Sequence, residues 1–378
     1  MINSGRVPVE DQQVEKRMRG KGTGRNFFAL SRDVWGKLWT IPTNNRLNLL
    51  TSYLVLLAGT GADHRLTKWS AKACEEYTGL GKPRAKLAIE ELIAAKIIRH
   101  TDASTRMMPQ YELPILPTDA EPIFLPVGLV TGLGGENPIL RRVRETGDAH
   151  LLRMLIDLYG LVELDATHGV GLAHVYAGRN EGHQPTARKV AEVGSHCIWG
   201  VTAGTWKSAG GDWAAVHRTK GKDAQPWAEF WGRFDLLKKI GAISFEPWLF
   251  DGEAKDAEPI MPLDSSGFYA VQNPTAEAEL TKAAFDAAQA LVTDERSYLF
   301  ERGGDFFVPL ALHRQTPAYR EVVKMRIEAD TPGRRLAWKR RQALIKQYGD
   351  GFVQLRRDAE RGEYGQPMRL GTRKGAAA

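Results

Sequence analysis

Residues 78–100 read TGLGKPRAKLAIEELIAAKIIRH. Pro83 suits the first turn of a helix, because the N–H that proline lacks has no intrahelical partner there. Apolar side chains at helical spacing predict a helix over about 82–95. Its inward side is expected to carry Leu87, Leu92 and either Ile89 or Ile93. The β-branched residues that follow predict a strand over 97–101.

The segment 27–114 around this stretch is expected to form one compact unit. Ser31 can cap a short helix, and Asn44 or Asn45 can cap a leucine-rich helix that stops at Gly59 and Gly61. A further short helical stretch is expected at 67–77, a turn at 102–105 and a returning strand at 107–113. Helices followed by a two-stranded hairpin are therefore expected.

This order resembles the winged helix-turn-helix of DNA-binding proteins. In that family a leucine on the recognition helix precedes a hydrophobic pair at the start of the wing, and Leu92, Ile97 and Ile98 occupy those places here. The family usually has Gly before the pair, where this chain has Lys96. The resemblance implies a domain that binds double-stranded DNA.

The same hydrophobic pattern occurs a second time. Leu237 matches Leu92 and Ile243 matches Ile98, and this copy has the expected Gly241. We expect residues 149–272 to form a second, decorated winged-helix-like domain. Its wing strands are expected at Phe245–Phe250 and Phe268–Val271, with the aromatic face before them formed by Trp227, Phe230, Trp231, Phe234, Leu237 and Ile240.

The remaining segments connect or flank these two modules. Proline and glycine predict an irregular linker over 115–148, and residues 1–26 are expected to be a disordered basic arm. A helical basic region is expected over 273–348, followed by a flexible tail over 349–378. The helices of this basic region are expected at 275–291, 317–329 and 332–348. The predicted fold is mainly α with small β-hairpin wings (α+β), with tandem winged-helix modules and a helical basic C-terminal region.

The positive charge is concentrated near the C-terminus. The chain carries a net charge of +7. From His313 onward, sixteen Lys and Arg face seven Asp and Glu, a balance of +9, so the preceding residues sum to −2. Thr331 and Pro332 suit the start of a helix that could contact phosphates. Its expected DNA-binding residues are Arg334, Arg335, Lys339, Arg340 and Arg341.

The first module carries its own basic residues. Residues at the start of a recognition helix reach base edges in a major-groove complex, while the preceding helix and the wing contact the backbone or the minor groove. The positions implied by the resemblance are Lys68, Lys72, Lys82, Arg84, Lys86 and Arg106.

Catalytic and metal motifs are not found in the sequence. It has no Walker A or dinucleotide motif, no His-Glu-x-x-His, no paired Cys-x-x-Cys and no Gly-x-Ser-x-Gly. We therefore expect neither an enzyme nor a cofactor. The nearby metal-capable residues fit no zinc spacing: His168, His174, His183, His196 and Cys197. Two cysteines, no secretory signal and no long apolar run predict a cytoplasmic protein without a membrane segment.

Three functions are compatible with these features. The first is sequence-specific binding of double-stranded DNA to initiate replication of a plasmid, phage or integrative element. The second is a transcriptional regulator with the same DNA contacts, whose region 149–272 would sense a ligand or partner. The third is a nucleic-acid-processing enzyme with an unrecognised metal site within 149–312. Expected partners are double-stranded DNA, a second copy of the chain in a homodimer, and host replication or transcription proteins.

Overall fold

The computed structural model describes residues 26–61, 63–116, 121–171, 187–202, 226–254, 256–264, 275–292, 300 and 305–363. Helices and small antiparallel sheets make this an α+β architecture, as predicted at that level. The chain divides into two compact units. Unit 1 comprises residues 1–162, 217–244 and 325–335, and unit 2 comprises residues 163–216, 245–324 and 336–378.

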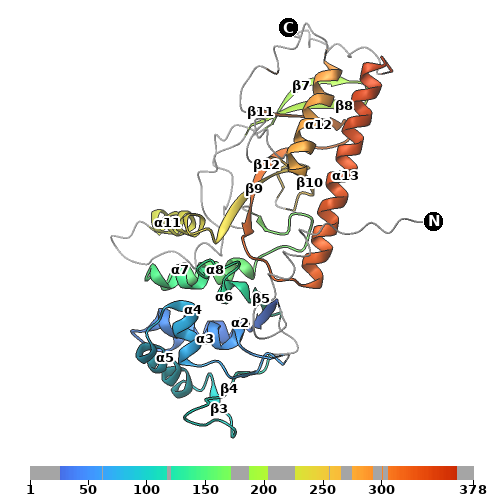
Figure 1. The fold of residues 1–378 in the computed structure, drawn as a ribbon. Helices are drawn as coiled ribbons and strands as arrows, with labels where there is room; N and C mark the ends of the chain where they lie inside the picture. The colour runs from blue at the N-terminus through green and yellow to red at the C-terminus, as the bar shows by residue number, and fades with distance from the viewer. Residues whose placement is uncertain are drawn as a thin grey trace, which may run out of the picture. The chain divides into compact units, whose positions relative to one another are not determined.

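Unit 1 is mostly helical (Figure 1). Its helices are α2 (Arg32–Thr40), α3 (Arg46–Ala58), α4 (Ala71–Thr78), α5 (Lys82–Ala94), α6 (Gly128–Thr131), α7 (Ile139–Glu145), α8 (Ala149–Tyr159) and α11 (Pro226–Lys239). Its strands are β1 (Phe27–Leu30), β2 (Leu66–Thr67), β3 (Arg99–His100), β4 (Tyr111–Glu112) and β5 (Ile123–Pro126).

Helix α3 is the centre of unit 1. Every residue from Leu49 to Ala58 is buried, because α3 packs against α4 and α5 and also against α6, α7 and α8. A helix that is apolar on all sides suits such an enclosed position. Its end at Gly59 is as predicted, and so is the cap of α2, where the Ser31 hydroxyl accepts from the Val34 N–H.

The helices α4 and α5 are followed by a short hairpin. Strands β3 and β4 pair antiparallel, as predicted, but each is only two residues long. The strand β2, which lies between α3 and α4 in the chain, pairs with the other side of β4. The sheet order is therefore β2-β4-β3, and the strand β2 was missed because two residues are too few for a sequence pattern.

The segment 115–148 is not the irregular linker that its prolines and glycines predicted. Strand β5 pairs with β1 along its whole length, from Phe27 opposite Pro126 to Leu30 opposite Ile123. Helices α6 and α7 follow it and pack against each other. Two prolines of this segment stand at element boundaries: Pro126 ends β5 and Pro138 precedes α7.

Unit 2 contains two sheets and two long helices. The first sheet has the order β10-β9-β12-β6, and the second has the order β11-β8-β7. The strands are β6 (Val170–Gly171), β7 (Ala187–Val193), β8 (His196–Thr202), β9 (Ile243–Phe250, from residue 245 onward), β10 (Pro259–Pro262), β11 (Asp305–Ala311) and β12 (Ala318–Met325, up to residue 324). The helices are α12 (Ala276–Leu291) and α13 (Pro332–Glu360, from residue 336 onward).

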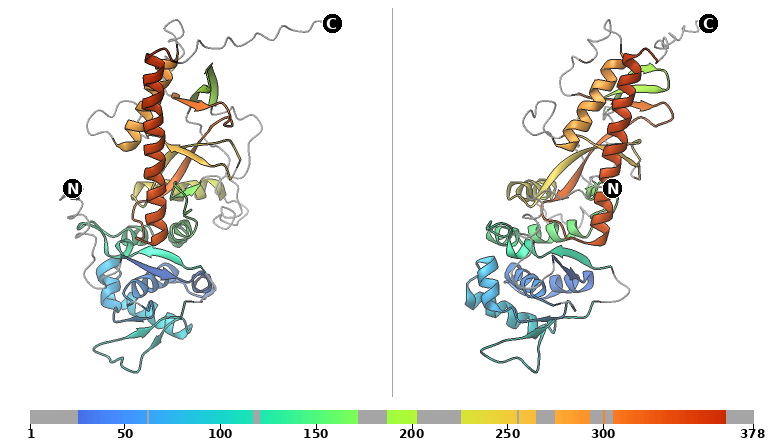
Figure 2. Two further views of the ribbon diagram at one scale, coloured as in Figure 1. Left: turned by 90° about the vertical axis from the view of Figure 1, so that its right-hand side faces the viewer. Right: turned by 45° about the vertical axis from the view of Figure 1, so that its right-hand side comes forward.

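The core of unit 2 lies between these helices and the sheets. Figure 2 shows α12 and α13 side by side, and both contribute side chains to one buried cluster with strands β7, β8 and β11. Thr275 caps α12 by accepting from the Ala278 N–H, so the helix predicted over 275–291 is confirmed. The Thr331 hydroxyl likewise accepts from the Arg334 N–H at the start of α13.

Two C-terminal predictions are wrong. Residues 318–325 form strand β12 instead of a helix, because Val322 and Val323 pair with Gly171 and Val170 of β6. Helix α13 continues to Glu360, where a flexible tail was expected from residue 349. Phe352 and Leu355 are buried in the cluster shared with α12, and this burial stabilises the last turns of the helix.

The second module does not form a unit of its own. Residues 149–272 are divided between units 1 and 2, and β8 pairs with β11, which lies beyond this segment. The first wing strand corresponds to β9, but β9 pairs with β10 at residues 259–262. The second predicted wing strand, 268–271, lies outside the described residues. Residues 1–25 of the predicted basic arm lie outside them as well.

The repeated pattern nevertheless has a structural basis. Lys96 and Gly241 both adopt a left-handed backbone, with φ of 57° and 68°. The next residue then bonds back to the helix: the Ile97 N–H donates to the Leu92 carbonyl, and the Ala242 N–H donates to the Leu237 carbonyl. At both occurrences of the pattern, a helix therefore ends at this left-handed residue and the chain continues into a strand.

Candidate nucleic-acid interface

The first part of the candidate interface is the pair of helices α4 and α5 in unit 1. Ser70 caps α4 by accepting from the Lys72 N–H, and Gly79 ends it in a left-handed conformation with φ of 66°. Helix α5 begins three residues later and packs on both α3 and α4. The turn between them sets the direction of α5.

Burial decides which face of α5 is exposed. The inward stripe consists of Ala85, Ala88, Ile89 and Leu92, at helical spacing. Leu87 was expected to point inward, but 49% of it is exposed. It lies five positions from Leu92, about 140° around the helix, and therefore faces outward.

The basic residues of α5 lie on its exposed surface. Lys82, Arg84 and Lys86 are all exposed, in the first half of the helix. Lys82 and Lys86 are four residues apart and share one flank of the helix. Arg84 is two residues from each of them, about 160° around the helix axis, and therefore lies on the opposite flank. Lys68 and Lys72, before and within the first turn of α4, are exposed as well.

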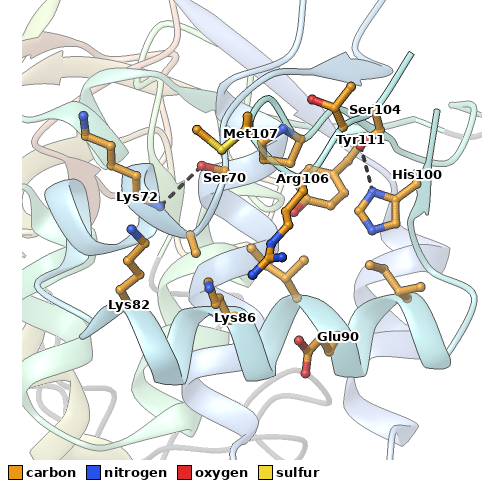
Figure 3. A pocket seen from close by; sticks show the side chains of 15 residues that line it. Ser70, Lys72, Lys82, Lys86, Glu90, His100, Ser104, Arg106, Met107 and Tyr111 are labelled. Atoms are coloured by element: carbon orange, nitrogen blue, oxygen red, sulfur yellow. Dashed lines mark hydrogen bonds between the residues drawn. The ribbon is translucent and has the colours of Figure 1, made fainter. Parts of the chain in front are cut away.

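A groove of about 680 Å³ runs between the start of α4, helix α5 and the turn of the hairpin. Figure 3 shows Lys72, Lys82, Lys86 and Arg106 around it, each from one of these three elements. Glu90 is the one carboxylate among the residues that line the groove. The four cations and single anion give the groove a charge of +3, which favours an anionic ligand.

These cations are available for a ligand. Within the residues that the structure describes, no carboxylate pairs with the side chains of Lys68, Lys72, Lys82, Arg84, Lys86 or Arg106. Two other arginines near the hairpin do have a carboxylate partner, since Arg99 of β3 and Arg65, just before β2, both pair with Glu112. The hydrogen bond from Arg99 lowers the pKa of Glu112, against the effect of desolvation, so this carboxylate stays ionised beside them.

Hydrogen bonds organise the turn between β3 and β4. The His100 ring lies 3.0 Å from the Ser104 hydroxyl and packs on Tyr111 at 5.0 Å between ring centroids. The Ser104 hydroxyl also accepts from the Gln110 N–H. Arg106 extends from this turn into the groove (Figure 3). The hairpin therefore presents Arg106 from a defined backbone.

The basic run of the late helix is mostly neutralised by ion pairs. In unit 1, Arg334 pairs with Glu328 at 2.5 Å and Arg335 with Asp330 at 2.8 Å. The hydrogen bond from Arg335 lowers the pKa of Asp330. In unit 2, Arg340 is exposed but donates to the Leu164 carbonyl, and Lys339 is exposed. Arg334 and Arg335 are thus paired with carboxylates, whereas no carboxylate among the described residues pairs with Lys339 or Arg340.

Arg341 is a structural residue of unit 2. Its side chain is only 12% exposed, pairs with Glu246 and Glu277, and lies over the Trp248 ring. Burial alone would lower the pKa of Arg341, but the two carboxylates raise it above its ordinary value. Arg341 is therefore removed from the candidate interface, because contact with a phosphate would require both ion pairs to break.

The histidines and the cysteine that lie near one another in the sequence, over residues 168–197, are described only in part. His174 and His183 lie outside the described residues, and Cys197 is buried in β8. No group of three or more His, Cys, Asp or Glu side chains suited to a metal is found in the described part of the chain. No described helix is long and apolar enough to cross a membrane.

The interface contains side chains that sequence reasoning missed. Glu90 and Met107 line the groove, yet neither was assigned a role. A signal existed for Met107 and Met108: they are an apolar pair within a polar turn. The place of Glu90 opposite the hairpin could not be predicted from the sequence, because it depends on how the hairpin folds back toward α5. The chain matches no protein-family model, no curated protein and no solved structure, so its function is inferred from this geometry.

Proposed function

We propose that the protein binds double-stranded DNA through unit 1, with α5 as the recognition helix of a winged helix. The observation that carries this proposal is the groove in which Lys72, Lys82, Lys86 and Arg106 face a single acid. The order α3-β2-α4-α5-β3-β4 and the sheet order β2-β4-β3 support the winged-helix assignment.

The dimensions of α5 suit the major groove of B-DNA. An α-helix with its side chains is about 10–12 Å wide, and the major groove is about 12 Å wide. The first half of α5 carries Lys82, Arg84 and Lys86, and docking by the N-terminal part would bring these side chains to base edges and phosphates. Glu90, one turn later, can accept a hydrogen bond from cytosine N4.

Duplex DNA fits the groove better than a single strand. Single-strand binding relies on exposed aromatic rings on which bases stack. The aromatic rings that line this groove are His100 and Tyr111, which pack on each other, and Tyr111 is buried. Binding would therefore depend on charge and on the shape of α5, as in recognition of a duplex.

The biological role of this binding has two candidates. Initiation of replication was suggested by tandem winged-helix modules, and the division of residues 149–272 between two units removes that support. Regulation of transcription needs only the module in unit 1. A footprint over direct repeats beside the gene's own origin indicates an initiator, whereas a promoter palindrome indicates a regulator that binds as a homodimer.

The direct test is fluorescence anisotropy of the full chain with a labelled duplex and the matching single strand, at low salt. We expect the duplex to bind more tightly, and its affinity to fall as salt rises. A duplex pool selected with the wild-type protein, followed by a genome-wide pull-down, then supplies the specific site. The proposal is contradicted if the protein does not bind the duplex at low salt, or if it binds the duplex and the single strand with equal affinity.

A further inference from the structure

The tip of the hairpin carries two exposed apolar side chains. Met107 is 88% exposed and Met108 is 75% exposed, the two highest values among the large hydrophobic residues that the structure describes. The next highest value is 68%, for Ile115 outside the turn. Apolar surface of this kind is unfavourable in water and gains free energy when a partner covers it.

The methionines belong to a turn that is closed by hydrogen bonds. The Thr105 N–H donates to the Met108 carbonyl at 3.1 Å, and the Met108 N–H donates to the Thr105 hydroxyl at 3.0 Å. Pro109 follows and restricts the chain further. Both side chains are thus held in solvent by an organised backbone, which lowers the entropy cost of inserting them into a partner.

The surroundings of the tip indicate which partner this is. Arg106 directly precedes the methionines, and Met107 itself lines the groove with Lys72, Lys82 and Lys86. A stable protein interface needs about 20–30 residues on each side, far more than a two-residue tip. A polyanion with a narrow apolar slot fits better, and the stacked base pairs of a duplex provide that slot.

We infer that Met107 and Met108 form a wedge that inserts between base pairs from the minor groove and kinks the DNA. This inference rests on the proposed function: with α5 in the major groove, the hairpin lies toward the neighbouring minor groove. Arg106 would hold the phosphates or the groove floor, while the unbranched methionine side chains enter the opened base step.

The test measures DNA bending separately from affinity. Duplexes from the selected pool carry a donor and an acceptor fluorophore at opposite ends, and energy transfer reports their end-to-end distance. The wild-type protein is expected to bend the duplex by about 20–90°. The double variant Met107→Gln/Met108→Gln keeps the length of the side chains but replaces their apolar ends.

The variant should bind without bending. Its affinity should change by less than about tenfold, because the lost burial of the methionines is offset by the unstacking that no longer occurs. A TA step in place of an A-tract should improve binding by the wild type but not by the variant, since TA steps open more easily. The matched control is Ile115→Gln, an exposed apolar side chain outside the turn, which should bend DNA like the wild type.

Two results overturn the wedge: a wild-type complex with straight DNA, or a double variant that bends DNA as strongly as the wild type. The second result would leave the methionines to a protein partner. These outcomes differ from failure of the proposed function, in which the wild-type protein does not bind the duplex at all.

Discussion

The cations on one flank of α5 offer the sharpest test of the interface. Lys82 and Lys86 are exposed, four residues apart, and line the groove with Lys72 and Arg106. Each cation that neutralises a phosphate adds about 0.9 to the negative slope of log affinity against log salt concentration. If all four contact phosphates, they contribute a slope of about −3.6, and the variant Lys82→Gln/Lys86→Gln removes about half of it.

The difference is large enough to measure by anisotropy. Over a roughly fourfold rise in salt, from about 50 to about 200 mM, the four cations together lower the affinity about 150-fold. In the double variant the corresponding loss is about 12-fold. Lys86→Gln alone should lie between the two.

Lys37→Gln is the matched control, because Lys37 is exposed on α2 and does not line the groove. Its salt slope should equal that of the wild type. Urea unfolding should show that all these variants keep their stability within about 0.5 kcal/mol, as expected of exposed side chains. A double variant with the wild-type slope would refute the assignment of this groove to DNA.

Three further predictions address α5, the turn that follows it and the ion pairs of Arg341. Arg84→Ala should weaken binding to the selected site by about 1–3 kcal/mol while leaving non-specific binding nearly unchanged, and an equal loss on both would mean that Arg84 contacts only phosphates. Lys96→Gly should raise the free energy of unfolding by about 0.5–1 kcal/mol in urea titrations, because the left-handed backbone at this position, with φ of 57°, strains any residue other than glycine. Lys96→Ala is the control, since alanine cannot relieve this strain. A glycine variant less stable than the wild type would contradict the reasoning. Arg341→Ala should destabilise the protein by about 1–3 kcal/mol, since it leaves the half-buried Glu246 and Glu277 without their shared cation. A change within the range of an exposed residue would contradict this ion-pair network. Burial by itself raises the pKa of Glu277, but Arg341 brings this pKa below the ordinary 4.5. The stabilisation of the fold by the Glu277–Arg341 pair is therefore complete above pH 4.5 and is lost as the pH falls through the lowered pKa. Between neutral and acid pH, the free energy of unfolding should thus fall less steeply in the Arg341 variant than in the wild type.

The structure also changes the interpretation of the charge distribution. The late helix has the densest run of cations in the sequence, yet the half-buried Arg341 and both Arg334 and Arg335 are paired with carboxylates. The groove in unit 1 has fewer cations, but they face solvent. For binding to a polyanion, unpaired exposed charge matters more than the number of Lys and Arg in a segment.

The sequence by itself determined the local features of this protein. Caps at Ser31, Thr275 and Thr331, the start of α5 beside Pro83 and the hairpin after it were all predictable. Each depends on side chains within a few residues of one another, so the information is present in a short stretch. The basic start of α5 could be predicted for the same reason, because helix periodicity alone places Lys82 and Lys86 on one flank.

Only the tertiary structure decided which segments pair and which charges remain free. Strand β12 is a strand because β6, about 150 residues earlier in the chain, supplies its hydrogen bonds. Arg341 is neutralised because Glu246, which is 95 residues away in sequence, comes to lie beside it. Pairing of strands and of buried charges depends on distances that exist only after the chain has folded, and no local pattern records them.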